Sequence, residues 1–245
     1  MSTAKTAWIA SCSALILASL IVGIMTRQGF TDYTTDVEAL EQLPYLASTY
    51  SVTRIDDDNA FFGSDFRNVE NALEEADVVI AGTFTGNRVY SYQAFLSTVR
   101  VDKVYKGGGR VSEGSDIGVF EPMSIVSFDS VAVLPQGAYA SGLPPMRQEA
   151  KYVLLLDEMG GLDGGSPGEL PQFRFYAEQD SGLSVLSRVC LESEINPFVG
   201  NDPSKTYGES LGIDIFAADE DSLADYLDIC RRLVASANSM SQARQ

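Results

Sequence analysis

The sequence predicts a mainly β fold with flanking helices, preceded by one N-terminal transmembrane helix. Three observations support this class. Short β-branched and aromatic runs, bounded by glycine, asparagine or proline, recur between residues 78 and 157 and are typical of strands. Residues 7–25 form a charge-free segment long enough to cross a membrane. Residues 221–237, near the end of the chain, carry apolar side chains at helical spacing.

The anchor is predicted from residues 7–25, which are flanked by Lys5 and Arg27. At about 1.5 Å of rise per residue, such a helix measures roughly 28 Å, close to the thickness of a bilayer core. Lys5 predicts a cytoplasmic N-terminus and an extracytoplasmic body by the positive-inside rule. A cleaved signal peptide is the alternative, but small residues at both required cleavage positions are hard to find after Leu20. We therefore predict a single-pass protein of the cell membrane, with residues 1–27 as its cytoplasmic start and retained anchor.

The body is strongly acidic. After residue 27 the chain carries 15 basic and 34 acidic side chains, a net charge of −19. This charge repels phosphate backbones, which proteins normally engage with clustered Lys and Arg, so we predict no nucleic-acid partner.

The chain contains no histidine. This absence excludes serine–histidine–aspartate triads, cysteine–histidine pairs and histidine-based zinc sites. The acidic run at residues 56–59 lacks the glycine and the distal glutamate of an EF-hand loop. We predict no cofactor and no metal site, while calcium binding by acidic clusters stays an open alternative.

Three cysteines are present, and Cys12 lies inside the apolar segment. Cys190 and Cys230 are the external pair. A disulfide between them would close a loop of about 40 residues and contribute roughly 4 kcal/mol in the chain-entropy model. Two free buried thiols are the alternative, because spacing along the sequence does not place two Cα atoms within bonding reach.

The mixed, polar residues 28–63 are predicted to form a stalk. The body then opens with a helix at Ser64 or Asp65, since apolar side chains follow at spacings of three to four. A strand at residues 78–84 comes next and is predicted to end in a turn at Gly86-Asn87.

A second strand is predicted from Phe95 to Tyr105. Val99 and Val101 share one face by period two, whereas Val104 has the opposite parity. A β-bulge near Asp102-Lys103 would keep Val104 inward, and such bulges let a strand coil around a barrel.

A short third strand at residues 117–120 leads into a connection from Met123 to Glu149, for which no structure is predicted. Loops of this length tend to be functional or mobile. Residues 151–157 have an unbroken apolar centre, which predicts a strand buried on both sides. Strands at residues 173–176 and 183–186 complete the β part.

The last predicted element is an amphipathic helix at residues 221–237. Its apolar stripe consists of Leu223, Tyr226, Leu227, Cys230, Leu233 and Val234. Ser222, with Asp225 three residues later, resembles a capping box. Packing of this helix on the barrel and binding of a partner are both open interpretations of the stripe.

The order of these patterns resembles a known module. The resemblance is carried by Ala76–Gly82, Val99–Gly107, Ile117–Val119 and Tyr152–Leu156. They are similar to the OB-fold domain of tissue inhibitors of metalloproteinases and netrin-type modules, and more closely to uncharacterised secreted or anchored proteins of Gram-positive bacteria. The resemblance implies a five-stranded, OB-like Greek-key barrel over residues 64–190, followed by a C-terminal extension, residues 191–245. The inhibitors chelate their target's zinc with a cysteine, and the corresponding stretch before the helix has none here, so inhibitory activity is not implied.

The predicted function is a membrane-anchored, extracytoplasmic, non-catalytic domain that binds a protein, a peptide or a cell-wall glycan. The alternative is a carboxylate-dependent glycan hydrolase, since two Asp or Glu suffice for that chemistry. The 34 acidic residues single out no pair. Aromatic side chains on loops supply contact area at low entropy cost. The candidate binding residues are therefore Tyr90, Tyr92, Phe128 and Tyr139, with packing at the barrel edge as the other interpretation.

Overall fold

The computed structural model describes residues 32–46, 69–127, 129–135, 143–159, 170–176, 187–191, 195–200 and 205–242. The chain forms two compact units, Met1–Leu40 and Glu41–Gln245. The predicted membrane segment, residues 7–25, lies outside the described residues, as does the predicted strand at residues 183–186. Among the helices in the described ranges, none is both long and apolar enough to cross a bilayer.

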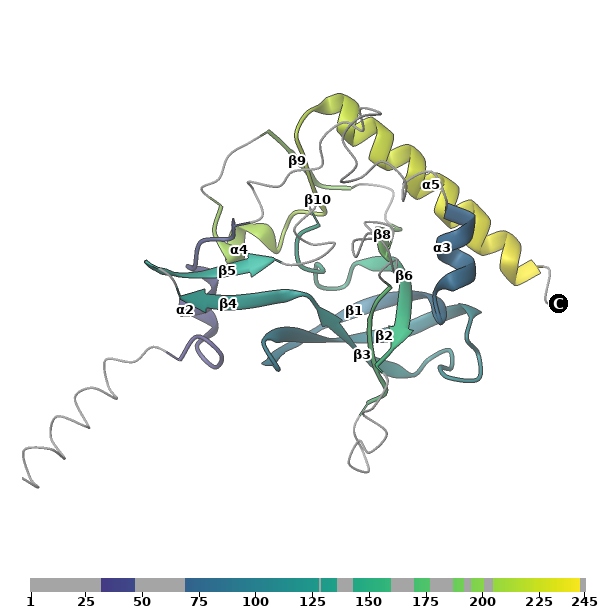
Figure 1. Ribbon diagram of the computed structural model, residues 1–245, viewed down its shortest axis with the longest axis horizontal. Helices are drawn as coiled ribbons and strands as arrows, with labels where there is room; N and C mark the ends of the chain where they lie inside the picture. The colour runs from purple at the N-terminus through teal and green to yellow at the C-terminus, as the bar shows by residue number, and fades with distance from the viewer. Residues whose placement is uncertain are drawn as a thin grey trace, which may run out of the picture. The chain divides into compact units, whose positions relative to one another are not determined.

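Five strands of the second unit close into a barrel (Figure 1). They are β1 (Val78–Ser91), β2 (Ala94–Lys106), β3 (Asp116–Glu121), β6 (Lys151–Glu158) and β7 (Gln172–Phe175). The order around the barrel is β1-β2-β3-β7-β6, and β6 pairs with β1 to close it. Neighbours are antiparallel except β3 and β7, which run parallel. The mainly β class predicted from the sequence is confirmed.

Strand β6 is paired along both edges. One edge is paired with β1, and the other is shared by β7 and by β8 (Arg188–Cys190). Residues 152–156 are all buried, as their unbroken apolar run predicts. Full pairing satisfies the backbone hydrogen-bonding groups, so this strand can lie within the core.

The predicted bulge in β2 is present. Ala81 of β1 pairs with Lys103 and Gly82 pairs with Val101, so Asp102 is the extra residue. A second shift follows at Tyr105, whose side chain is buried, while that of Val104 is only half-buried. The position of the bulge was therefore predictable, but the side chain that it turns inward is Tyr105.

The predicted turn at Gly86-Asn87 is wrong. β1 continues through these residues to Ser91, with an irregularity between Phe84 and Arg88. The chain reverses at Tyr92-Gln93, where both residues have positive φ, 51° and 62°. Asn-Gly-type pairs usually mark two-residue hairpin turns, but here the glycine serves a bulge within a long, curving strand.

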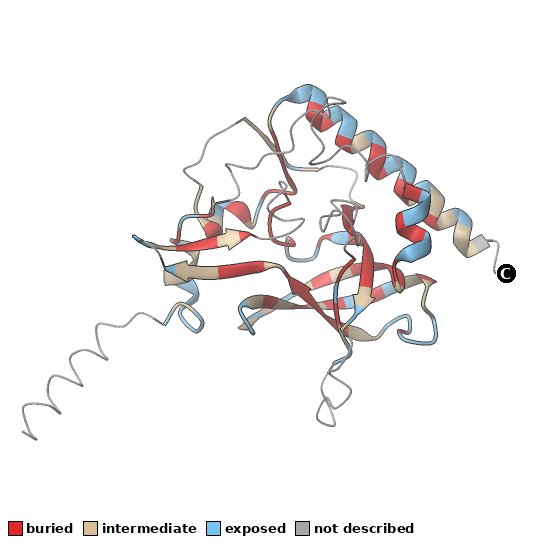
Figure 2. Ribbon diagram, viewed as in Figure 1, coloured by how far each residue is buried: buried red, intermediate tan, exposed pale blue. Residues whose placement is uncertain are grey.

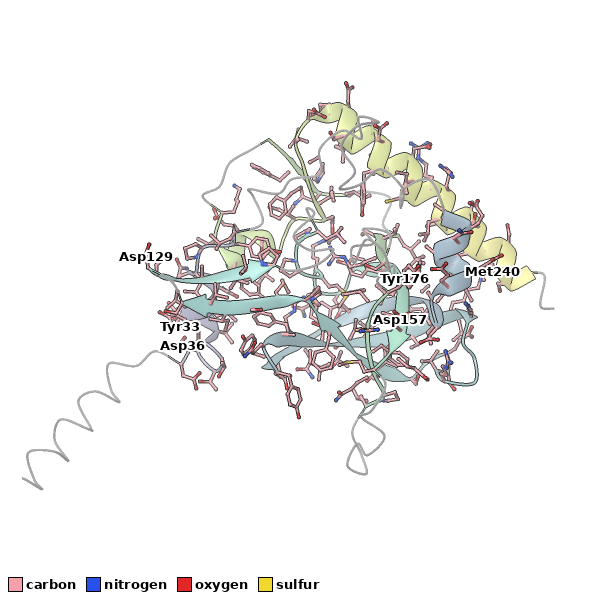
Figure 3. All side chains as sticks on the ribbon, viewed as in Figure 1. Tyr33, Asp36, Asp129, Asp157, Tyr176 and Met240 are labelled. Carbon is pink, nitrogen blue, oxygen red and sulfur yellow. The ribbon has the colours of Figure 1, made fainter. Side chains whose placement is uncertain are left out.

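The connection after β3 is also more ordered than predicted. It contains a hairpin of β4 (Met123–Ser127) and β5 (Val131–Pro135). In Figure 3, Asp129 marks the turn of this hairpin. Residues 143–150 then return to β6 without regular structure.

The end of the predicted stalk belongs to the core of the body. Tyr45 has no exposed surface, and its backbone N–H donates to the Lys205 carbonyl at 2.8 Å. Its ring packs near those of Tyr207 and Phe216, with centroids 6.3 and 6.0 Å away. Burial of an aromatic ring stabilises this attachment through its large apolar area. The short helix α2 (Val37–Glu41) precedes it and buries no residue.

Helices α3 (Val69–Glu75) and α5 (Glu220–Gln242) flank the barrel and contact each other. Helix α5 also contacts β2, β9 (Pro197–Val199) and β10 (Ile215–Ala217). Strands β9 and β10 pair in parallel. The short helix α4 (Tyr207–Ser210) lies between these two strands in the sequence. The predicted C-terminal helix is present and extends beyond residues 221–237. Its capping residue is Asp219 and not Ser222, because the Asp219 carboxylate accepts a bond from the Ser222 N–H at 2.7 Å.

Candidate functional site

A cavity of about 720 Å³ lies between helix α5 and the chain around β8 and β9. We call it the α5 groove. Its described lining consists of Cys190, Leu191, Ile195, Pro197, Leu223, Leu227, Cys230, Arg231, Val234 and Ala235. Figure 3 shows the side chains of α5, with Met240 near its carboxyl end. The volume and the apolar lining are typical of sites that bind small molecules or anchoring side chains.

Helix α5 forms one wall because its apolar stripe is wider than the surface that the barrel covers. Leu223, Cys230 and Leu233 are buried, and Figure 2 shows the buried residues along one side of the helix. Leu227 and Val234 are only half-buried and line the groove. These two residues lie seven apart, which places them on the same face two turns apart.

The opposite wall is held by polar contacts beneath it. The N–H of Leu191 donates to the Lys151 carbonyl at 2.7 Å, which fixes the residue that follows β8. Two hydrogen bonds of 2.8 Å join Asn196 and Asp214. The Asn196 N–H donates to the Asp214 carboxylate, and the Asp214 N–H donates to the Asn196 carbonyl. The Asp214 carboxylate also pairs with Arg147 at 3.2 Å. The wall is thus tied to the ends of β6 and β10.

One charged side chain occurs in the described lining of the groove, and it is cationic. Arg231 is 74% exposed and lies 3.7 Å from Asp228 of the same helix. An exposed pair of this kind is weak, so the guanidinium can exchange partners at little cost. It is a cationic contact point at the groove in a chain of net charge −17.

Cys190 and Cys230 are not joined by a disulfide bond, and both are buried beside the groove. This is one of the two states that the sequence left open. Burial raises the pKa of the Cys230 thiol to about 12, partly offset by a hydrogen bond from the Tyr226 hydroxyl. Cys230 is therefore almost entirely protonated at neutral pH.

The predicted aromatic residues lie elsewhere. Tyr90 is in β1, where its hydroxyl accepts from the Ile125 N–H at 3.1 Å and its ring meets Phe95 edge-on at 5.1 Å. Tyr92 is 85% exposed at the hairpin turn. Neither lines the α5 groove. Phe128 and Tyr139 lie outside the described residues.

A buried charge cluster was missed by the sequence reasoning. Glu121 has no exposed surface and accepts bonds from Arg88 Nε at 2.7 Å, from the Ser97 hydroxyl and from the Met146 N–H at 2.8 Å. The guanidinium of Arg188, itself buried, lies 4.0 Å away. The parity of Glu121 with Ile117 and Val119 along β3 was the available signal. With its oxygens engaged in this way, the carboxylate holds strands together.

No family model, no curated protein and no solved structure matches this chain. In the part of the chain that the structure describes, no three Cys, Asp or Glu side chains are arranged to hold a metal ion.

Proposed function

We propose that this protein is a membrane-anchored, extracytoplasmic, non-catalytic binding domain that takes an apolar segment of a protein or peptide in the α5 groove. The observation that carries the proposal is the groove itself, in which half-buried Leu227 and Val234 face Leu191 and Ile195 around open space. Apolar side chains that remain partly exposed in a concave site gain free energy when a partner covers them.

The apolar lining of the groove and its one described cation, Arg231, indicate which class of partner the groove can bind. A cell-wall glycan would offer mostly hydroxyl groups, which this apolar lining cannot satisfy. A peptide with spaced apolar side chains and one acidic residue fits both the lining and the Arg231 guanidinium. We therefore favour a peptide segment over a glycan.

The fold supports a binding role by analogy. The strand order with its parallel β3–β7 pair is the order expected of an OB-like Greek-key barrel. A five-stranded barrel of this kind is what the sequence resemblance to the inhibitor and netrin-type modules, and to anchored proteins of Gram-positive bacteria, implies. Fold alone does not determine function, so the barrel topology supports a binding role less strongly than the α5 groove does.

The location of the body outside the cell is proposed from the sequence. Residues 7–25 lack charge, and Lys5 precedes them. The net charge of −19 after residue 27 suits a body that stands away from anionic lipid headgroups.

A non-catalytic role is favoured over glycan hydrolysis by the state of the buried carboxylates. Glu121 is bonded to Arg88, and Asp214 to Arg147. No carboxylate occurs in the described lining of the α5 groove. A glycosidase needs two carboxyl groups that flank the substrate across a cleft.

Selection from a random peptide library tests the groove as a peptide site. The full-length protein in lipid nanodiscs is the bait, and enriched peptides are then measured against Val234→Glu. We expect peptides with spaced apolar residues and an acidic residue. The variant should lose more than about tenfold in affinity, because the new carboxylate puts a charge into the apolar groove and competes with the acidic residue of the peptide for Arg231.

The matched control is Ala224→Glu, which adds the same charge to an exposed position of α5 outside the groove lining. It should change affinity by less than about twofold, as expected for a rim charge. If the enriched peptides bind Val234→Glu and the unmodified protein equally well, the groove is not the peptide site. Failure to enrich any peptide would also contradict the proposal.

A further inference from the structure

Two cysteines that are distant in the sequence line the same cavity. Cys190 ends strand β8, and Cys230 lies near the middle of α5. Both line the α5 groove and both are buried, with 9% and 5% of their surface exposed. Arg188 of β8 also interacts electrostatically with Tyr226 of α5, so the strand and the helix lie close together at this point.

We propose that Cys190 and Cys230 form a reversible dithiol–disulfide site that joins β8 to α5 when a disulfide-donating oxidant reaches the groove. The structure represents the reduced form. The inference does not depend on which ligand the groove binds.

The surroundings of the two sulfur atoms favour a pair over two unrelated thiols. Each thiol influences Tyr226 electrostatically, and Cys190 contributes to the raised pKa of Cys230. Tyr226 and both thiols therefore lie in one neighbourhood. One cavity lies against both cysteines, which leaves open space beside them for an approach of the helix and the strand end. A disulfide requires such an approach, to about 4.4–6.8 Å between Cα atoms.

The exchange balances with oxidised glutathione as the oxidant. The Cys190 thiolate attacks one sulfur of glutathione disulfide, forms a mixed disulfide and releases one glutathione, and Cys190 has the larger exposed fraction of the pair. Cys230 then loses its proton and attacks the Cys190 sulfur, which releases the second glutathione. The protein loses two protons and two electrons, and glutathione disulfide takes them up to become two thiols. Burial holds the Cys230 pKa at about 12, so few Cys230 groups are thiolates at neutral pH and the second, intramolecular step is the slower one.

The experiment uses the full-length protein in detergent micelles with Cys12→Ser, so that only this pair can react. Thiols are alkylated after denaturation, before and after incubation with oxidised glutathione, and the protein is analysed by intact mass and peptide mapping. We expect two alkylated cysteines before oxidation and none after it, a mass lower by two hydrogens, one peptide linking Cys190 to Cys230, and full reversal by dithiothreitol.

Single variants and stability complete the test. Cys230→Ser should stop at a glutathione adduct on Cys190. Oxidation should raise the unfolding temperature of the parent protein by several degrees and leave that of Cys230→Ser unchanged, because the bridge restricts the unfolded chain. Two alkylatable thiols after exposure to an oxidant concentration that bridges the urea-unfolded chain would overturn the proposal. Two stable glutathione adducts, cross-linked dimers, or a lower unfolding temperature on oxidation would do so as well.

Discussion

Glu121→Gln is expected to lower the free energy of unfolding by about 3–5 kcal/mol, the range found when one partner of a buried ion pair is removed. The carboxylate has no exposed surface and lies 2.6 Å from Arg88 Nη2 and 4.0 Å from Arg188 Nη1. Glutamine preserves the shape of the side chain, so no cavity forms. It removes the negative charge that pairs with Arg88 and Arg188 and leaves their two guanidinium groups without it in the core.

The measurement is urea unfolding of the full-length protein in micelles. Far-UV circular dichroism, which reports backbone secondary structure, monitors the transition. Asp116→Asn is the matched control, because Asp116 also pairs with an arginine, Arg100, but at the exposed surface. The control should leave the midpoint nearly unchanged. Equal midpoints for the two variants would mean that the Glu121 cluster contributes no more than a surface pair.

Leu154→Ala and Leu155→Ala are each expected to cost about 2–5 kcal/mol of stability, the range for truncation of a buried leucine. Both residues have no exposed surface. They pair with Ile80 and Val79 of β1, and successive side chains of a strand face opposite sides. One leucine therefore faces the barrel interior and the other faces the segments that cover the barrel, so both layers are tested.

The same unfolding measurement applies, with Lys151→Ala as the control at the exposed start of β6. Both leucine variants should shift the midpoint far more than the control does. A large shift for one leucine and a control-like shift for the other would show that β6 is covered on one side only.

Strong local patterns predicted most of the barrel. The apolar run of β6 and the parity change in β2 are visible in the sequence because each depends on side-chain alternation within one strand. The hairpin turn was missed because Tyr92 and Gln93 adopt positive φ without being glycine or asparagine, a choice that local propensity disfavours. The hairpin of β4 and β5 was missed because its proline and serine residues resemble those of a loop.

The sequence predicted one wall of the candidate site, helix α5, but not the opposite wall. The apolar stripe of α5 was predicted, but which of its residues the barrel covers depends on tertiary packing, which leaves Leu227 and Val234 at the groove. Residues Leu191, Ile195 and Pro197 carry no motif and join the site only through the position of β8 and β9. The aromatic residues that the sequence favoured include Tyr90, whose ring packs against Phe95 and whose hydroxyl accepts a hydrogen bond from the Ile125 N–H. Solvent-exposed Tyr92 stays a candidate contact at a second surface.

We propose that a partner occupies the α5 groove in the native setting. Position-resolved photo-cross-linking in intact cells tests it most directly, with a benzophenone amino acid placed in turn at Leu227, Val234 and Ala224. We expect the same covalent adduct from the two groove positions, mapped to an apolar segment of the partner, and none from exposed Ala224. Adducts of equal yield from all three positions, or none from either groove position, would contradict it.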